Sequence, residues 1–90
     1  MHFKCSKTQQ LFNGEVVKSF EPFRRIAERK LQQLDDATEI RDLKSPPGNR
    51  LEKLKGDREG AYSIRINDQF RICFRWQDGQ AIDVEIVDYH

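Results

Sequence analysis

The chain has 90 residues, 37% of them hydrophobic and 34% charged, which suits one domain with one modest core and excludes a multidomain protein. Sixteen Lys and Arg against fifteen Asp and Glu give a net charge of +1, so composition alone does not indicate a polybasic nucleic-acid binder or an acidic tail. The charge is unevenly spread, because residues 50–75 carry seven basic and four acidic groups, whereas residues 76–90 carry four acidic groups and no Lys or Arg.

The apolar residues form no long run, and the longest is the stretch Ile72-Cys73-Phe74. Neither a signal peptide nor a membrane-spanning helix is predicted, so we expect a cytoplasmic protein with no membrane contact. Cys5 and Cys73 lie far apart, with no CxxC pair or Cys/His cluster, as is usual for structural thiols in a reducing compartment. We therefore expect no disulfide, no metal site and no cofactor.

The first half of the chain is predicted to be helical. Residues 1–4 could form a short edge strand, and Leu11-Phe12 one turn of helix that ends at Asn13-Gly14. Residues 23–34 then show the spacing of an amphipathic helix, with Pro22 tolerated in its first turn. The apolar positions of this helix are Phe23, Ile26, Ala27, Leu31 and Leu34.

A second, shorter helix is predicted after Asp35-Asp36. Thr38 can cap it, and Ile40 and Leu43 supply its apolar pair. The segment 45–49, with sequence SPPGN, ends this helix because neither proline can continue the hydrogen-bond ladder.

After Asn49 the apolar period changes from helical to alternating, which predicts an antiparallel meander. The alternating segments are residues 62–66, 70–76 and 82–86, and turn signals occur at residues 56–60, 67–69 and 77–80. One face of this sheet is apolar throughout, and the helix at 23–34 is the segment with enough matching apolar surface to cover it. The fold class is therefore α+β.

The loop at residues 67–69 fixes the register of the first hairpin. A loop of odd length keeps Ile66 opposite Phe70 on the apolar face, and it places Arg65 opposite Arg71 on the other face. Two like charges in directly opposed positions destabilise a hairpin by roughly 0.2–1 kcal/mol, so an anionic group would relieve this pair.

The same rule applied to the next hairpin pairs Arg75 with Asp83 and Cys73 with Glu85. These pairs would compensate part of the positive charge. Trp76 alternates onto the apolar face, which favours a place in the core over stacking on a base.

Six basic residues lie on or lead into the predicted meander. They are Lys53, Lys55, Arg58, Arg65, Arg71 and Arg75. Together they can present a positive surface to a phosphate backbone. Charges on an exposed strand face also serve solubility and edge protection, so both interpretations stay open on these residues alone.

The last three residues, Asp88, Tyr89 and His90, place a carboxylate, a phenol and an imidazole at the end of the last predicted strand. Metal-free RNA cleavage needs a base for the ribose 2′-OH, an acid for the departing 5′-oxygen and cations for the phosphoryl oxygens. Imidazole suits either proton transfer near pH 7, and guanidinium groups bind phosphoryl oxygens with two donors. An RNA-cleaving site and an ordinary polar chain end are both open interpretations here.

Three stretches of the sequence resemble the HigB-type toxins of the RelE/ParE superfamily, the host-inhibition toxins of bacterial toxin–antitoxin pairs. The stretches are residues 27–60, which include LKGDR, residues 63–76 with SIRINDQFRICFRW, and residues 84–90, which end in DYH. The resemblance implies one compact RelE-like domain over residues 1–90, with two N-terminal helices packed on an antiparallel sheet of about four to five strands.

The resemblance also implies a function. Similar toxins are metal-independent endoribonucleases that cut messenger RNA in the ribosomal A site and so inhibit translation and growth. They are silenced by an antitoxin of the HigA type, which carries a helix-turn-helix DNA-binding domain, and the complex represses its own operator DNA. The expected partners are therefore this antitoxin, the ribosome, its messenger RNA and, with the antitoxin, operator DNA.

Carried over to matching positions, the resemblance assigns catalytic roles to five residues. Asp88, Tyr89 and His90 match the terminal DYH, with His90 as the candidate for proton transfer. Arg71 matches the arginine of the RICF strand and would stabilise the scissile phosphate, and Lys55 matches the lysine of LKG and would neutralise backbone charge.

One position departs from the family pattern. Glu52 stands where some members carry a second catalytic histidine, so it is a possible replacement base, although its charge would repel phosphate. The candidate contacts to backbone phosphates are Lys53, Arg58, Arg65 and Arg75. The three arginines lie on or beside the predicted sheet.

Two other functions remain open from the sequence. The ParE branch shares the fold and poisons DNA gyrase without ribonuclease chemistry, and the terminal DYH argues against that branch. A non-catalytic module that binds RNA or the ribosome is favoured by Glu52 at the position of the family histidine.

Overall fold

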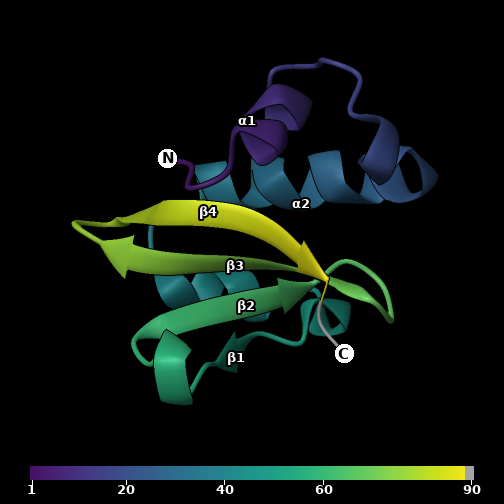
Figure 1. Ribbon diagram of the computed structural model, residues 1–90. Helices are drawn as coiled ribbons and strands as arrows, with labels where there is room; N and C mark the ends of the chain where they lie inside the picture. The colour runs from purple at the N-terminus through teal and green to yellow at the C-terminus, as the bar shows by residue number, and fades with distance from the viewer. Residues whose placement is uncertain (89–90) are drawn as a thin grey trace.

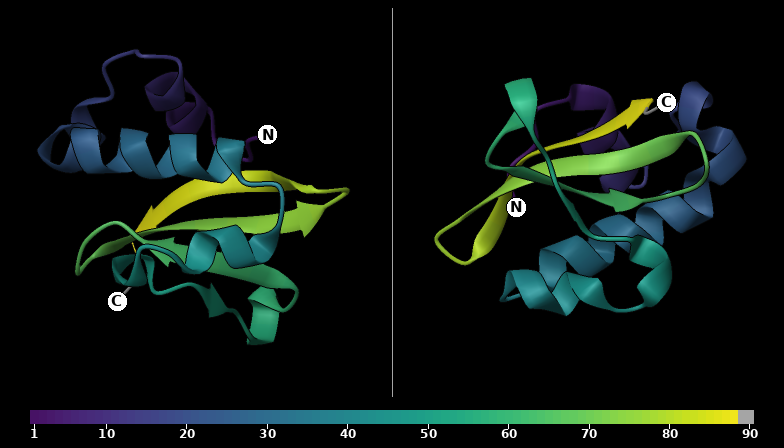
Figure 2. Two further views of the ribbon diagram at one scale, coloured as in Figure 1. Left: turned by 180° about the vertical axis from the view of Figure 1, so that it is seen from behind. Right: turned by 90° about the horizontal axis from the view of Figure 1, so that it is seen from below.

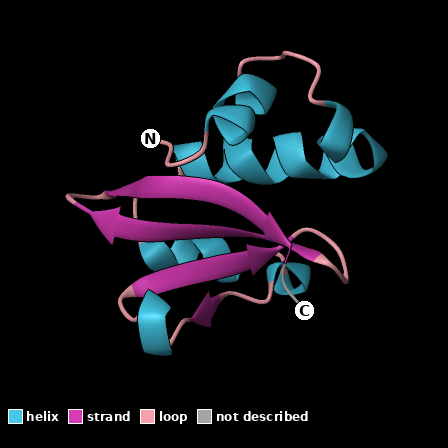
Figure 3. Cartoon of the chain, viewed as in Figure 1, coloured by secondary structure: helices cyan, strands magenta, loops and turns pink. Residues whose placement is uncertain are grey.

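The computed structural model describes residues 1–88, and in these residues two α-helices pack against one face of a four-stranded antiparallel sheet (Figure 1). The helices are α1 (Ser6–Phe12) and α2 (Arg24–Asp36), and the strands are β1 (Glu52–Lys53), β2 (Ala61–Arg65), β3 (Phe70–Gln77) and β4 (Gln80–Asp88), in the spatial order β1-β2-β3-β4. Short 3₁₀ helices lie between them: η1 (Lys18–Phe23), η2 (Ile40–Lys44), η3 (Pro47–Asn49) and η4 (Gly56–Arg58). The predicted α+β class, the meander and its three turns are confirmed, and Figure 3 shows the two layers by secondary structure.

The long helix α2 lies where the apolar spacing predicted it. Ala27, Leu31 and Leu34 are buried on one face, but Ile26 is 40% exposed, so its place on the apolar face was predicted wrongly. Pro22 lies in η1 and not in the first turn of α2, because η1 is the turn that buries the rings of Phe20 and Phe23 side by side.

The predicted second helix is the 3₁₀ helix η2. Glu39, and not Thr38, caps it, in a capping box with Asp42 whose carboxylate accepts the Glu39 backbone N–H at 3.1 Å. Thr38 donates its hydroxyl to the same carboxylate. Leu43 is buried as expected, and the chain leaves the helix at Ser45 before the two prolines.

The outer edge of β4 is covered by the beginning of the chain. The predicted strand at residues 1–4 amounts to a single parallel bridge between Phe3 and Val84, supported by backbone hydrogen bonds from residues 2–4 to β4. The Ile86 N–H then donates to the hydroxyl oxygen of Thr8, which is fully buried at the start of α1. These contacts satisfy donors that an open sheet edge would leave unpaired.

The register of the β2–β3 hairpin is the predicted one. Ile64 pairs with Ile72 and Arg65 with Arg71, and the Ile66 N–H donates to the Phe70 carbonyl at 3.0 Å. The three-residue loop thus keeps the isoleucines of both strands on the helix side of the sheet.

The β3–β4 hairpin contains a bulge that the parity rule missed. Cys73 pairs with Glu85 as predicted, but Arg75 pairs with Ile82 and not with Asp83, so β4 carries one extra residue at Asp83. The cause is the tight turn at Asp78-Gly79, where both residues have positive φ as a two-residue type I′ hairpin requires. A two-residue loop reverses the side-chain parity, and the bulge restores it before Val84 and Ile86 reach the core.

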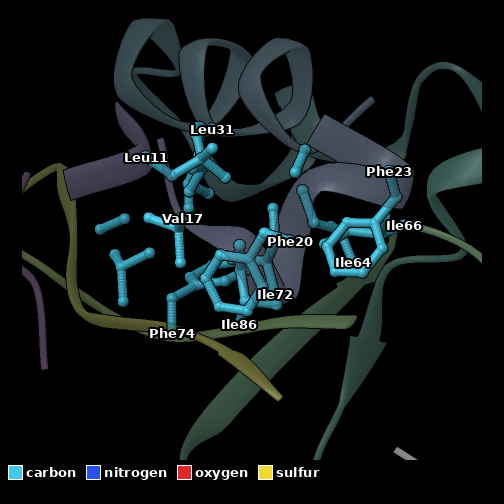
Figure 4. Close-up of a cluster of buried hydrophobic side chains, with 14 of the residues drawn as sticks. Leu11, Val17, Phe20, Phe23, Leu31, Ile64, Ile66, Ile72, Phe74 and Ile86 are labelled. Carbon is cyan, nitrogen blue, oxygen red and sulfur yellow. The ribbon is translucent and has the colours of Figure 1, made fainter. Parts of the chain in front are cut away.

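The main core lies between the helices and the inner face of the sheet. Figure 4 shows side chains from α1, η1 and α2 meeting those of β2, β3 and β4. Trp76 and Ala81 border this core from beyond the bulge, which confirms the inward position of the tryptophan. Within residues 1–88, no helix is long and apolar enough to cross a membrane.

Thr8→Val tests the cover of the β4 edge. The change keeps the side-chain shape but removes the oxygen that accepts the Ile86 N–H at 3.0 Å, leaving a buried donor unpaired. We expect the free energy of unfolding in urea to fall by about 1–3 kcal/mol. Ser19→Ala, at an exposed position, should change it by less than about 0.5 kcal/mol. Equal stability of Thr8→Val and the parent chain would contradict the assigned hydrogen bond.

Candidate functional site

The candidate residues gather on the outer face of the sheet, which we define as the face turned away from α1 and α2 (Figure 2). Strand pairing places on it Glu52, Leu54, Ala61, Ser63, Arg65, Arg71, Cys73, Arg75, Glu85 and Val87. This face is not purely polar, because Leu54, Ala61 and Cys73 form a second small apolar cluster. Burial raises the pKa of the Cys73 thiol, and the nearby carboxylates of Glu85 and Glu52 act in the same direction.

Arg71 is the most constrained cation on the outer face. Its Nε donates to the Ser63 hydroxyl at 2.7 Å, and its Nη2 donates to the Arg50 carbonyl at 2.7 Å. The residue is 9% exposed, so its guanidinium is largely shielded from solvent. These two acceptors set the direction in which the guanidinium plane faces.

The like-charge pair of Arg65 and Arg71 exists as predicted, and the structure shows how it is relieved. Arg65 turns to the exposed carboxylate of Asp68 in the loop, with which it forms an ion pair. Arg71 turns the other way, to Ser63 and the Arg50 carbonyl. The expected anionic relief is therefore supplied for Arg65 from inside the hairpin loop.

Glu52 lies on the same face as Arg71. It pairs with Ser63 across β1 and β2, and Ser63 pairs in turn with Cys73, so Glu52, Ser63, Cys73 and Glu85 form one row across all four strands. The structure thus puts the possible replacement base next to the serine that holds Arg71.

Asp88 lies at the same end of the sheet as Arg71. It pairs with Phe70, one residue from the Arg71–Val87 pair, and its carboxylate accepts the side-chain N–H of Gln69 at 3.0 Å. Tyr89 and His90, the other two residues of the predicted DYH site, lie outside the described residues. We call this end of the sheet, with Arg50, Arg65, Arg71 and Asp88, the Arg71 end.

Lys53 and Lys55 are not brought to the Arg71 end. Lys53 pairs with Tyr62, whose ring stacks on Phe74 on the helix side, so Lys53 projects from the opposite face to Glu52. Lys55 follows β1 in the direction away from Arg50, and the three residues from Glu52 to Lys55 span up to about 10 Å of extended chain. Both lysines are exposed.

Arg58 and Arg75 lie at the other end of the outer face, beside a cavity of about 370 Å³. Arg58 forms an ion pair with Glu85 at 3.1 Å, and Arg75 donates to the Glu59 carbonyl at 3.3 Å. The charged side chains that line the cavity are Lys4, Arg58, Arg75, Asp57, Asp83 and Glu85. Because cations and acids balance there, this cavity offers a phosphate less net attraction than its arginines alone suggest.

Three residues that matter for the site were not identified from the sequence. Ser63 and Arg50 hold the Arg71 guanidinium, and Asn49 is fully buried directly before Arg50. Ser63 could have been found, since the correct register places it next to Arg71 on the outer face. Arg50 acts through its carbonyl and Asn49 through a tertiary contact, and no pattern in the sequence signals either.

The arrangement can orient a cation at the edge of the sheet where β2 and β4 end and β3 begins. A guanidinium fixed in this way is suited to a phosphoryl group, whose charge it stabilises without reorganising. Glu52 adds a carboxylate on the same face, whereas Asp88 lies at the same end of the sheet but pairs with Phe70, whose ring packs on Phe23 on the helix side. Across residues 1–88, no group of three or more His, Cys, Asp or Glu is placed to hold a metal ion.

Comparison with protein families gives one match across almost the whole chain. The model of the RelE-like toxin of the type II toxin–antitoxin system HigB matches residues 2–90. Toxin HigB-1 of Vibrio cholerae serotype O1 is 51% identical over 55 residues, which are 61% of this chain and 58% of that protein. Endoribonuclease HigB of Proteus vulgaris is 44% identical over 61 residues, or 68% of this chain and 65% of that protein. The chain thus spans less than two thirds of the length of either relative.

The fold also has relatives among solved structures. A chain in the crystal structure of the heterotetrameric YoeB–YefM toxin–antitoxin complex from Staphylococcus aureus aligns with a TM-score of 0.59, covering 99% of this chain and 93% of that chain. A second YoeB–YefM complex from the same organism aligns with a TM-score of 0.56. Both are 20% identical to this chain. At this identity the alignments confirm the arrangement of helices and sheet and nothing more.

Ser63→Ala tests the anchoring of Arg71. The change removes the oxygen that accepts the Arg71 Nε–H at 2.7 Å inside a buried site. We expect the free energy of unfolding to fall by about 1–3 kcal/mol, because a buried charged donor loses its partner. Ser19→Ala on the exposed surface of η1 is the matched control and should be near neutral. The same small effect in both variants would show that Ser63 does not hold Arg71.

Proposed function

The chain belongs to the HigB-like family of RelE-type toxins found in type II toxin–antitoxin systems, and from this membership we propose that it is an endoribonuclease that cleaves messenger RNA on the ribosome. The substrate is the messenger RNA in the ribosomal A site, and the outcome is inhibition of translation and growth. The resemblance of the site to this class of toxin, together with the sequence similarity to Endoribonuclease HigB of Proteus vulgaris, supports the proposal.

The observation that carries the proposal is the anchored guanidinium of Arg71. It occupies the position where the family has its phosphate-stabilising arginine, and two hydrogen bonds of 2.7 Å fix its orientation at the end of the sheet. An arginine that served only solubility would extend into solvent. Here a buried arginine is held at the end of the sheet where β4 also ends, at Asp88, from which the chain continues to Tyr89 and His90.

The proposed reaction is transesterification within the RNA. A base takes the proton of the ribose 2′-OH, the 2′-oxygen attacks the neighbouring phosphorus, and the bond to the 5′-oxygen breaks as that oxygen accepts a proton. The products are a 2′,3′-cyclic phosphate and a 5′-OH end. His90 is the proposed proton-transfer group, assisted by Tyr89 and Asp88, and Arg71 stabilises the additional phosphoryl charge.

The second proton-transfer group has one candidate, Glu52. Glu52 lies on the face of Arg71 and can take the position of the family histidine as the base. No metal ion is required by this scheme, because cationic side chains stabilise the phosphoryl oxygens. Lys55, Lys53, Arg58, Arg65 and Arg75 are the proposed contacts to backbone phosphates, reached along the strand of RNA and not at the cleaved bond.

We propose a HigA-type helix-turn-helix antitoxin as the partner that silences the chain. With that partner the complex would bind operator DNA and repress its own operon, and without it the toxin would act in the cytoplasm on the ribosome. Each of the two YoeB–YefM complexes contains a chain with this fold, and this supports an antitoxin as partner.

Two substitutions test the catalytic residues. His90→Ala and Arg71→Lys should each lower messenger RNA cleavage in a reconstituted translation system by about a hundredfold or more, since one removes the proton-transfer group and the other the bidentate fork. Because Arg71 is nearly buried, urea unfolding must show that each variant is folded under the assay conditions. Lys18→Ala, an exposed cation on η1, is the matched control and should cleave normally. Full cleavage by both folded variants would contradict the site.

Induction of the chain without an antitoxin tests the function itself. Mapped 5′ ends of messenger RNA should show cuts inside reading frames, and a block of translation should abolish them. Growth arrest with intact messenger RNA and an induced SOS response would favour gyrase poisoning. Ribosome binding without any cuts would favour the non-catalytic module.

A further inference from the structure

The acceptor that holds the end of Arg71 is a backbone carbonyl in an unusual conformation. Arg50 has φ 46° and ψ 54°, in the left-handed region that L-residues other than glycine rarely adopt. Its carbonyl accepts the Arg71 Nη2 at 2.7 Å. Contacts made by neighbouring residues must impose this conformation, because an isolated arginine would not adopt it.

Asn49, the residue before Arg50, makes hydrogen bonds that can impose this conformation. It is completely buried, and its side-chain Nδ2 donates to the Gln33 side chain at 3.0 Å, to the Leu43 carbonyl at 3.1 Å and, less closely, to the Ser45 carbonyl at 3.4 Å. Its Oδ1 accepts a hydrogen bond from the Lys30 ammonium. One amide thus joins α2 to both η2 and the segment that leads into β1.

Lys30 reaches Asn49 from an unfavourable position. Burial lowers the pKa of its ammonium, and the charges of Arg29 and Arg65 lower it further. The hydrogen bond to Asn49 offsets part of this cost. Asparagine is suited to the role because its two N–H donors are shared among three carbonyl oxygens and its own oxygen accepts from a cation, whereas an aspartate would repel the carbonyls.

We propose that Asn49 is a positioning residue for RNA cleavage, which fixes the Arg50 carbonyl and through it the guanidinium of Arg71. The inference rests on the proposed function for its catalytic meaning. Its structural part, that Asn49 sets the geometry of Arg71, does not depend on that function. Asn49 touches neither the RNA nor the reacting atoms.

Asn49→Ala tests this role with two readouts. The first is the single-turnover rate of cleavage of ribosome-bound messenger RNA, which should fall by roughly tenfold to a hundredfold when the guanidinium is misplaced. The second is the ¹⁵N–¹H signal of the Arg71 Nε, which should move and exchange faster with water. Both are measured on the 90-residue chain made by cell-free synthesis, at a temperature where urea unfolding shows the variant to be folded.

Thr8→Val is the matched control, because it removes a buried hydrogen bond on β4 and touches neither Ser63 nor Arg50, the residues that hold Arg71. It should cleave normally and keep the Arg71 signal. Should Asn49→Ala fail to fold, Gln33→Ala removes one side-chain partner of Asn49 and should shift the Arg71 signal in the same direction by a smaller amount.

The outcomes separate the two claims. If Asn49→Ala leaves the Arg71 signal unmoved and loses cleavage only in proportion to its unfolded fraction, as Thr8→Val would, the positioning role is overturned. If the parent chain cuts no messenger RNA while Asn49→Ala still moves the Arg71 signal, the control of Arg71 by Asn49 is supported and the proposed ribonuclease fails. If Asn49→Ala both moves the Arg71 signal and cleaves messenger RNA more slowly, the positioning role and the proposed ribonuclease are both supported.

Discussion

The pairing of β3 with its two neighbours is the constraint on which the rest of the structure depends, because β3 is covered on both faces. Ile72 and Phe74 are buried against the helices, while Arg71 and Cys73 are buried on the outer face. A shift by one residue would exchange these sets, placing an arginine in the apolar core and isoleucine beside the polar partners. The cost of burying an unpaired charge excludes that alternative, so β3 has one acceptable register.

Two turns of different length have to meet this one register. The three-residue loop between β2 and β3 satisfies it directly, whereas the two-residue turn at Asp78-Gly79 reverses it and needs the bulge at Asp83. The bulge is thus the consequence of a tight turn joined to a two-faced strand. It also takes Asp83 out of the pair with Arg75, although both residues line the cavity beside Arg58, so the compensation of charge on the outer face differs from the simple alternating pattern.

The sequence predicts what depends on neighbouring residues and fails where distant ones decide. The apolar period predicted α2, and the odd loop predicted the opposition of Arg65 and Arg71, because both follow from the local chain. The Asp78-Gly79 pair did signal a turn, but its length, and therefore the bulge, depends on positive φ at both residues. From the sequence, the segment that contains Asn49 indicated only the end of a helix. The contacts of Asn49 with Lys30 and Gln33 join parts of the chain 16 to 19 residues apart, which no local pattern signals.

The candidate site was predicted from a resemblance, and the structure shows which of its described members share one place. Arg71, Glu52 and Asp88 lie at or near one end of the sheet, where Ser63 holds Arg71 from a regular strand. The second anchor, the Arg50 carbonyl, belongs to a connecting segment without regular pairing, and such segments are the least rigid parts of a small domain. How well the orientation of the Arg71 guanidinium is fixed therefore depends on the rigidity of that segment. A single buried amide tied to α2 gives it the rigidity that a strand pair would otherwise supply, and this links the order of the site to the same helix that covers the core.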